Sequence, residues 1–119
     1  MAAGSPVFLS FAQADLTLRE QRQSLIASNV ANANTPGYHA IDIDFENSLS
    51  SALKSGINSL GEVQYKAGNP SNLDGNDVSL TAEKLESLKN VNAMKSEVTY
   101  LHQSTKDLIT ALRPNPNGI

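Results

Sequence analysis

The sequence predicts a mainly α-helical protein in which two long terminal helices pack as a coiled-coil-like pair. Apolar residues recur at steps of three, four and seven residues near both ends of the chain. The segment between them carries most of the glycines among many polar residues. We therefore expect the middle to hold a short helix and a polar loop, partly extended or disordered, outside the pair. A chain of 119 residues is expected to form a single domain.

The first helix is predicted over residues 7–31, where no Pro or Gly interrupts the run from Val7 to Val30. Its apolar residues form two series at seven-residue spacing. The first series is Phe11, Leu18 and Leu25. The second is Leu9, Leu16 and Val30, which lies about 200 degrees around the helix from the first. The helix therefore has two candidate contact faces.

We expect these two faces to be shared between the partner helix and neighbouring subunits. The chain is 39% hydrophobic and only 5% aromatic, which leaves little material for a large closed core. A polar belt, Arg-Glu-Gln-Arg-Gln at residues 19–23, interrupts the apolar run at its middle. Because a guanidinium binds a carboxylate through two parallel hydrogen bonds, Arg22 is our first candidate for an ion pair between subunits.

The first helix is predicted to end in a cluster of asparagines that leads into a tight turn. Asn29, Asn32 and Asn34 are unfavourable inside a helix because their short amides compete for backbone groups. A residue before proline prefers extended backbone angles, and a glycine after it accepts positive φ. We expect the turn to set the register between subunits. The residues of the turn motif are Asn34, Thr35, Pro36, Gly37 and Tyr38.

The predicted middle segment spans residues 35–78. Residues 38–45 alternate partly, with isoleucines on one side and Asp42, Asp44 and Glu46 on a solvated side. Asp44 can cap a short helix over residues 45–54, which Gly56 would end. Residues 58–76 read as loop, in which residues 62–66 are the one short extended candidate.

The second long helix is predicted over residues 79–112, with Ser79 or Thr81 as its N-cap. It should end at Arg113, which precedes a proline, and residues 113–119 form a tail. Its apolar seam alternates steps of three and four residues. The seam is Val91, Met94, Val98, Leu101, Thr105, Leu108 and Leu112.

Composition excludes several classes of function. The net charge is −3, and the nine basic residues are scattered among twelve acids, which argues against a nucleic-acid partner. No apolar run reaches the roughly 20 residues that span a bilayer, and no cleavable secretory signal is recognisable at the N-terminus. The chain has no cysteine, which removes disulfides, thiolate chemistry and Cys-based zinc sites.

We predict no catalytic, cofactor or metal site. The two histidines, His39 and His102, lack a third ligand at a suitable spacing. The acids of residues 42–46 would lie along a flat strand edge, where they cannot enclose a calcium ion. Residues 72–77 read as an Asx turn that leads into a helix. No serine stands in the context of an activated nucleophile, so the sequence predicts that the protein is not an enzyme.

The segment Ala-Ser-Asn-Val-Ala-Asn-Ala-Asn-Thr-Pro-Gly-Tyr at residues 27–38 resembles the N-terminal signature of the bacterial flagellar axial proteins, the family of rod and hook subunits. The resemblance extends upstream through Leu18, Arg22 and Leu25. Downstream, Asp-Ile-Asp-Phe at residues 42–45 is similar to the proximal-rod branch of that family. Residues 73–78, followed by Glu83 and Asn90, resemble the start of its C-terminal helix.

This resemblance implies a structural subunit of the flagellar basal body that polymerises helically into a rod, transmits torque and encloses the export channel. It also implies homo- and hetero-oligomeric contacts with other rod proteins, the inner-membrane ring and the export-gate junction. The implied location is the periplasm-spanning rod, reached through type III export without a cleaved signal peptide. The expected assembly interface is Phe11, Leu18, Arg22, Leu25, Asn29, Asn32, Val91, Met94, Val98, Leu101 and Leu108.

Two alternatives remain open at the level of the sequence. Ser79 and Met94 depart from the proximal-rod pattern, which favours another rod or hook-like subunit if these positions outweigh the Asp-Ile-Asp-Phe match. A small helical secretion adaptor, which would hold a partner helix in a groove, is a different class. An adaptor has no need of the asparagine-rich turn.

Overall fold

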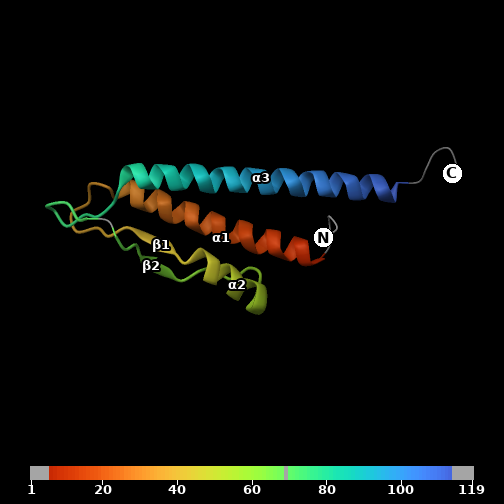
Figure 1. Cartoon of the computed structure of the whole chain (residues 1–119), viewed down its shortest axis with the longest axis horizontal. Coiled ribbons are helices and arrows are strands. Elements are labelled where there is room, and N and C mark those ends of the chain that lie inside the picture. The colour runs from red at the N-terminus through yellow and green to blue at the C-terminus, as the bar shows by residue number, and fades with distance from the viewer. Residues whose placement is uncertain (1–5, 69, 114–119) are drawn as a thin grey trace.

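The computed structural model describes residues 6–68 and 70–113 of an elongated molecule with principal extents of 74 × 27 × 17 Å. Its elements are α1 (Pro6–Ala31), β1 (Ile41–Ile43), α2 (Phe45–Ser55), β2 (Val63–Tyr65) and α3 (Leu80–Leu112). The two long helices run antiparallel along the long axis (Figure 1). This confirms the predicted mainly α fold with a terminal helix pair and a short middle helix. The predicted tail lies outside the described residues, except for Arg113.

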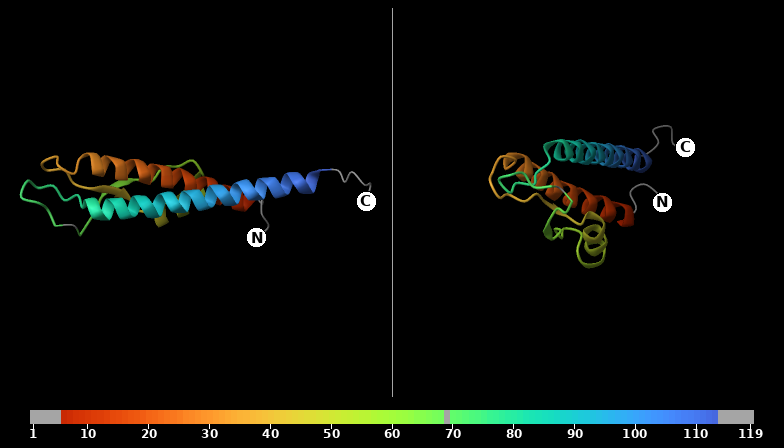
Figure 2. Two further views of the ribbon diagram at one scale, coloured as in Figure 1. Left: turned by 90° about the horizontal axis from the view of Figure 1, so that it is seen from above. Right: turned by 60° about the vertical axis from the view of Figure 1, so that its left-hand side comes forward.

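Helix α1 is the central element. It lies between α3 and the layer that contains β1, β2 and α2 (Figures 1 and 2). Gln23 bonds to Ser87 of α3, whereas Gln21 and Arg22 bond to Gly61 and Asp42 of the middle segment. We expected neighbouring subunits to cover part of α1. This is corrected, because α3 and the middle segment of the same chain already cover two of its sides. Leu9 and Val30 of the second series remain exposed.

The two extended segments form a small antiparallel sheet. β1 pairs with β2, with Ile41 opposite Tyr65 and Ile43 opposite Val63. Both segments were predicted to be extended. The sequence pattern did not predict that they pair with each other. Helix α2 fills the connection, capped by the Asp44 side chain at the N-terminus and by Gly56 at the C-terminus, as predicted.

Helix α3 is capped at its N-terminus by Ser79, whose hydroxyl accepts a hydrogen bond from the backbone N–H of Ala82 at 3.3 Å. Its C-cap is Arg113, and the 33 residues between the caps give a length of about 50 Å. The side that packs on α1 carries a polar series at seven-residue spacing. This series, which we call the polar stripe, is Glu83, Asn90, Glu97 and Ser104.

The predicted apolar seam of α3 is not the centre of its contact with α1. At 3.6 residues per turn, the seam lies about 60 degrees around the helix from the polar stripe. Val98, Leu108 and Leu112 are 53%, 50% and 74% exposed. At Val98 the difference follows from the rotation of α3, which the hydrogen bonds of Asn90 and Glu83 to α1 fix. Leu108 and Leu112 belong to the last turns of α3, which extend past the N-terminal end of α1 (Figure 1). The seam is left along the flank of the pair.

The apolar core is small. Its buried members are Ala12, Ala14, Leu18, Ile26, Ala40, Ile43 and Ala52. Alanines let the backbones approach closely, but each buries little apolar area, so the hydrophobic stabilisation of the isolated chain is modest. No helix within residues 6–68 and 70–113 combines the length and the apolar character needed to cross a membrane.

Candidate functional site

The asparagine-rich end of α1 forms a hydrogen-bonded hub around Asn29, which is fully buried. Its Nδ2 donates to the carbonyl of Ile41 at 2.8 Å and to Glu83 Oε1 at 3.0 Å. Its Oδ1 accepts from the Ile41 N–H at 2.9 Å and from the Tyr38 hydroxyl at 3.1 Å. All four hydrogen-bonding positions of the carboxamide are therefore used, and they join α1, β1 and α3.

The turn that follows is closed by local hydrogen bonds. Asn32 Nδ2 donates to the Ser28 carbonyl at 2.9 Å, and its Oδ1 accepts from the Thr35 hydroxyl at 3.1 Å. Gly37 has φ of +73°, the positive value that the turn was expected to require. Its N–H donates to the Asp74 carbonyl at 2.8 Å, which ties the turn to the loop before α3.

Asn76 holds that loop against the turn. It is fully buried, and its Nδ2 donates to the carbonyls of Asn32 and Thr35, each at 2.8 Å. Its Oδ1 accepts from the Val78 N–H at 2.8 Å, while its own N–H donates to Asp74 Oδ1 at 3.0 Å. These two bonds are Asx turns of the predicted kind. The segment that resembles the axial signature, residues 27–38, and the segment that resembles the start of the C-terminal helix, residues 73–78, thus meet in one network.

Asp77 completes the connection to β1. Its Oδ1 accepts from the Ala40 N–H, and its Oδ2 lies 3.2 Å from His39 Nδ1. The hydrogen bond from the Ala40 N–H is the main cause that lowers the pKa of Asp77, and the neighbouring His39 adds to it. The aspartate therefore stays ionised and keeps accepting these bonds over a wide pH range.

A buried ion pair lies on the other side of the hub. Glu83 is fully buried, and its Oε1 accepts from Lys66 Nζ at 3.0 Å as well as from Asn29. Within the part of the chain that the structure describes, Glu83 Oε2 has no hydrogen-bond partner. Removal of Lys66 would leave the carboxylate without its counter-charge, so the pair fixes the first turn of α3 against β2.

Arg22 forms its two-pronged ion pair within the chain. Its Nε and Nη2 donate to the two oxygens of Asp42 at 3.1 and 2.8 Å. These hydrogen bonds from Arg22 to Asp42 raise the pKa of the guanidinium. Asp42 is therefore not on the solvated strand side that the sequence predicts, because the sheet docks on α1 and presents it to Arg22. An ion pair of Arg22 with a neighbouring subunit stays a prediction.

A second group of charged residues lies between the middle parts of the long helices. Asp15 Oδ2 accepts from Arg19 Nε at 2.8 Å, and Arg19 also reaches Asn90 Oδ1 at 3.3 Å. Glu97 of the polar stripe faces Asp15. Burial, together with the Asp15 carboxyl, raises the pKa of Glu97 to about 8. Glu97 is therefore protonated at neutral pH.

The predicted interface residues divide into three groups. Leu18 and Asn29 are fully buried by the chain itself and offer no surface to a partner, which corrects their assignment. A half-buried group consists of Arg22, Leu25, Asn32, Val91, Met94 and Leu101. The exposed group consists of Phe11, Val98 and Leu108. The exposed residues Phe11, Val98 and Leu108, together with the exposed parts of the half-buried side chains, form what we call the helix-pair surface.

Two shallow grooves follow the junction of α1 and α3. One, of about 330 Å³, is lined by Phe8, Phe11, Ala12, Ala93, Ser96, Glu97 and Tyr100. The other, of about 390 Å³, is lined by Gln23, Ile26, Ala27, Val30, Ala31, Lys84 and Ser87. Both are open and largely apolar, so they suit the side chains of a packed neighbour better than an enclosed small molecule.

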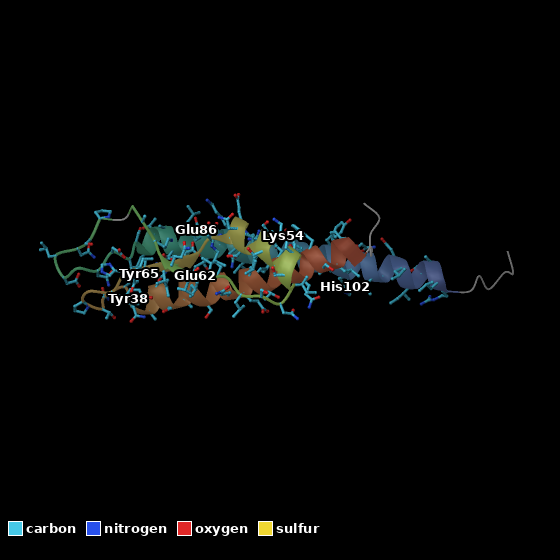
Figure 3. The ribbon with its side chains drawn as sticks, turned by 90° about the horizontal axis from the view of Figure 1, so that it is seen from below. Tyr38, Lys54, Glu62, Tyr65, Glu86 and His102 are labelled. Atoms are coloured by element: carbon cyan, nitrogen blue, oxygen red, sulfur yellow. The ribbon has the colours of Figure 1, made fainter. Side chains whose placement is uncertain are left out.

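Residues 34–38 lie at one end of the molecule, where Tyr38 is labelled in Figure 3.

The two histidines lie far apart. His39 packs edge-to-face on Tyr65, with ring centroids 5.7 Å apart, and Figure 3 shows Tyr65 and His102 in different parts of the molecule. The two histidines therefore do not converge. Among the residues the structure describes, no three His, Asp or Glu side chains are grouped so that they could hold a metal ion.

Sequence reasoning missed several residues that hold the site together, above all Asn76, Lys66 and the polar stripe. A signal for the stripe is present, because Glu83, Asn90 and Glu97 recur every seven residues on a helix predicted to pair. Lys66 has no such signal, since its partner depends on how the sheet docks. Asn76 lies in the loop that was read as an Asx turn, but its bonds to the first turn are long-range.

An elongated helix pair with a hydrogen-bonded turn at one end and apolar side chains along its flank is typical of a structural subunit. Residues 9–39 match the family model described as flagella basal body rod protein. This match covers the end of α1 and the turn, where the hub lies.

Curated relatives extend the match over most of the chain. Flagellar basal body rod protein FlgB of Escherichia coli K12 is 30% identical, covering 88% of this chain and 92% of the relative. FlgB of Salmonella typhimurium is 31% identical over the same shares. FlgB of Cereibacter sphaeroides is 35% identical, covering 82% of this chain and 88% of the relative. The chain belongs to the FlgB family of flagellar basal body rod proteins.

Proposed function

We propose that this rod protein polymerises helically with other rod subunits into a stiff shaft that transmits torque and encloses the export channel. The observation that carries the proposal is the exposed apolar seam of α3, where Val98, Leu108 and Leu112 remain in solvent although they recur at helical spacing. Isolated exposed leucines are common, but a periodic series along a helix pair indicates a packing surface. No catalytic step is part of the proposal.

The contacts would form along the helix-pair surface. Full burial of a Leu, Val or Phe side chain contributes roughly 1.5 to 3 kcal/mol, so a half-exposed one contributes about 1 kcal/mol when a neighbour covers it. Among the residues that the structure describes, four of the seven buried apolar residues are alanines. Burial by neighbours would therefore add a large fraction to the apolar stabilisation of each subunit.

The hub and the turn would position this surface rather than contact the partner. Asn29 and Asn76 lock the end of α1 to the start of α3. This rigid end would set the register of each subunit against the next, with Thr35, Pro36 and Gly37 exposed beside it. A subunit that is already rigid at one end loses less conformational entropy on assembly than a flexible one.

The proposed partners are other rod proteins, the inner-membrane ring and the junction with the export gate. The proposed location is the rod of the basal body, which crosses the periplasm. We further propose that the subunit reaches it through the type III export channel with an uncleaved N-terminal region. The family membership supports this location.

A matched pair of substitutions tests the proposal. Val98→Glu places a charge on the exposed seam, and Thr99→Glu places the same charge on the adjacent, exposed position about 100 degrees around the helix. Each variant is expressed in the parent bacterium lacking its own copy, and motility and isolated basal bodies are examined. We expect Thr99→Glu to restore motility and Val98→Glu to leave basal bodies without a complete rod. Complete rods and full motility with Val98→Glu, from a variant shown to be folded, would overturn the proposal.

A further inference from the structure

Helix α3 carries a second periodic series on a side that points away from α1. Its members recur at steps of three and four residues, and basic side chains stand between apolar ones. At about 100 degrees per residue, the centre of the series lies about 130 degrees around the helix from the polar stripe. The series, which we call the cationic seam, is Lys84, Leu88, Val91, Lys95, Val98, His102, Lys106, Ile109 and Arg113.

The side chains of the cationic seam are largely uncovered. All five of its basic residues are exposed, and none of them forms an ion pair within residues 6–68 and 70–113. Leu88, Val98 and Ile109 are also more than half exposed. A helix face that meets only water has no use for apolar residues between its charges. The seam therefore has the composition of a helix contact.

The acids of α3 lie on other sides of the helix, about 100 to 160 degrees from the centre of the cationic seam. They are Glu83, Glu86, Glu97 and Asp107. The seam thus gathers the positive charges of three lysines and one arginine, although the whole chain has a net charge of −3. Because no acid stands among these like charges, an acidic partner would relieve their repulsion.

An apolar groove adjoins the first residue of the cationic seam. This is the groove of about 390 Å³, in which Lys84 stands opposite Ile26, Ala27 and Val30 of α1. A partner that places a carboxylate beside Lys84 can therefore seat a neighbouring apolar side chain in the groove. Both the groove and the mixed seam call for a partner that is acidic and amphipathic.

The spacing of the cationic seam indicates the shape of this partner. Steps of three and four residues form the ridges along which one helix packs on another. The seam runs from Lys84 to Arg113, which corresponds to about 44 Å at 1.5 Å per residue. The matching partner is a helix of similar length, with carboxylates opposite the cations and apolar side chains between them.

The helices of this chain do not supply such a face. α1 exposes a single acid, Glu20, and α2 is only 11 residues long. On α3, Glu83 is fully buried and Glu97 lies against Asp15. A second copy therefore lacks a row of acids that could follow the cations of the seam. The charges favour a different protein as the occupant.

We propose that the cationic seam binds an acidic amphipathic helix of another protein, with carboxylates paired to Lys84, Lys95 and Lys106 and an apolar side chain seated in the groove. The inference rests on the proposed function, because it names the chemistry of one partner of the rod subunit. One exposed ion pair contributes little to affinity, but a row of them along a packed helix sets the register and the choice of partner.

Charge reversal in the bacterium tests the cationic seam. The double variant Lys95→Glu/Lys106→Glu reverses two charges of the seam. Its matched control is Lys54→Glu/Lys89→Glu, since Lys54 lies on α2 and Lys89 lies about 140 degrees from the centre of the seam. Each is expressed in the parent bacterium lacking its own copy, and swarming is measured. We expect the control to swarm normally and the seam variant to swarm less than half as far. Normal swarming of a folded seam variant would overturn the proposal.

Suppressor selection then identifies the occupant of the cationic seam. Motile revertants of the seam variant should carry acid-to-base substitutions on one face of a helix in a different protein. Reintroduction of such a substitution beside the unmodified chain should weaken swarming, because it places like charges opposite each other. Suppressors confined to this chain would make a second copy the occupant and would overturn the proposal.

A binding measurement on the purified full chain tests the same contact directly. The probe is a synthetic 30-residue helical peptide with glutamate and leucine at the spacing of the cationic seam, and its control has the same composition with the glutamates spread around the helix. Fluorescence anisotropy should show at least tenfold tighter binding of the first peptide, which weakens with added salt. The seam variant should bind it at least tenfold more weakly than the unmodified chain.

Two results of the binding measurement would overturn the helix as occupant. The first is equal binding of both peptides, which would reduce the seam to a general polyanion site. The second is seam-dependent binding to phosphatidylglycerol vesicles without binding of either peptide, which would make the occupant a membrane surface. Circular dichroism and thermal unfolding identify any variant that fails to fold.

The failure of this inference is distinguishable from failure of the proposed function. If Val98→Glu prevents rod formation while the seam variant supports normal swarming, the inference fails alone. If complete rods and full motility are found with both, the proposed function fails as well.

Discussion

The carboxamide of Asn29 pairs with both main-chain groups of Ile41, as a neighbouring β-strand would. Its oxygen accepts from the Ile41 N–H at 2.9 Å and its nitrogen donates to the Ile41 carbonyl at 2.8 Å. In an antiparallel pair, every second residue directs its N–H and C=O away from the partner strand. Asn29 satisfies these groups of Ile41 on the side of β1 that faces α1. One helical side chain thus closes an edge of the sheet.

Replacement of Asn29 by alanine should lower the free energy of unfolding by about 3 kcal/mol. The substitution leaves the N–H and C=O of Ile41 without partners, and each buried group left unpaired costs roughly 1 to 3 kcal/mol. Urea unfolding measures the change. Asn34→Ala is the control, because Asn34 belongs to the same motif but is exposed, and it should cost less than about 0.5 kcal/mol. Equal costs at both positions would contradict the hub.

Gly37 should tolerate asparagine better than alanine. A Cβ at this position meets nothing within 4 Å, so the cost is conformational and comes from φ of +73°. A left-handed conformation costs an ordinary L-residue about 1 to 2 kcal/mol, and asparagine adopts it more readily. We expect Gly37→Ala to lower stability by about 1 kcal/mol and Gly37→Asn by less. Thermal unfolding of the two variants decides this, and the reverse order would argue against the turn geometry.

Arg22 and Asp42 should be energetically coupled. The guanidinium donates two hydrogen bonds to the carboxylate, and both side chains are about three-quarters buried, with 25% and 20% of their area exposed. A cycle of Arg22→Lys, Asp42→Asn and the double variant measures the coupling by urea unfolding. We expect about 1 to 2 kcal/mol, since lysine cannot reproduce the two-pronged geometry. Additive effects of the single variants would show that the ion pair contributes nothing to stability.

Stability should fall as the pH rises from about 4.5 to about 8. The folded chain raises the pKa of Glu97 from its ordinary value of 4.5 to about 8, because the carboxyl is buried and faces Asp15. Between these values the folded state binds a proton that the unfolded state has released, so the free energy of unfolding decreases as the pH increases. Arg19, the cation that faces the pair, opposes the shift without cancelling it.

The variant Glu97→Gln isolates this contribution. It should flatten the pH dependence between pH 5 and 8, because the amide cannot ionise between the helices. Glu20→Gln, at an exposed position of α1, should leave the pH dependence as it is in the unmodified chain. The measurement is chemical unfolding at several pH values. A pH profile of Glu97→Gln that matches that of the unmodified chain would show that Glu97 ionises normally in the fold.

Local signals in the sequence were sufficient for the helices and their caps. Ser79, Asp44 and Gly56 each act within a few residues of their own position, so a single sequence contains what determines them. The same holds for Gly37, whose positive φ follows from the turn. The terminal helix pair was also predictable, because seven-residue periodicity requires a partner of similar length.

The contacts between segments were not predictable in the same way. The bonds from Asn29 to Ile41 and from Arg22 to Asp42 depend on how the sheet docks on α1, which no local pattern encodes. The apolar periodicity of α3 also predicted the wrong centre for its contact with α1, because that prediction assumes that apolar residues face the partner helix. Here Asn90 and Glu83 face α1, because their hydrogen bonds compensate for the loss of water. Val98 of the apolar seam was left exposed for the same reason.

A cryo-electron microscopy map of the basal body would show whether apolar side chains of the terminal helices, uncovered in the single chain, are buried by neighbouring subunits. We expect Val98 and Leu108 to lie in dry contacts with adjacent subunits in the rod, while Asn29 keeps its bonds to Ile41. A map in which Val98 and Leu108 face open solvent, or in which the rod lacks this chain, would contradict this expectation.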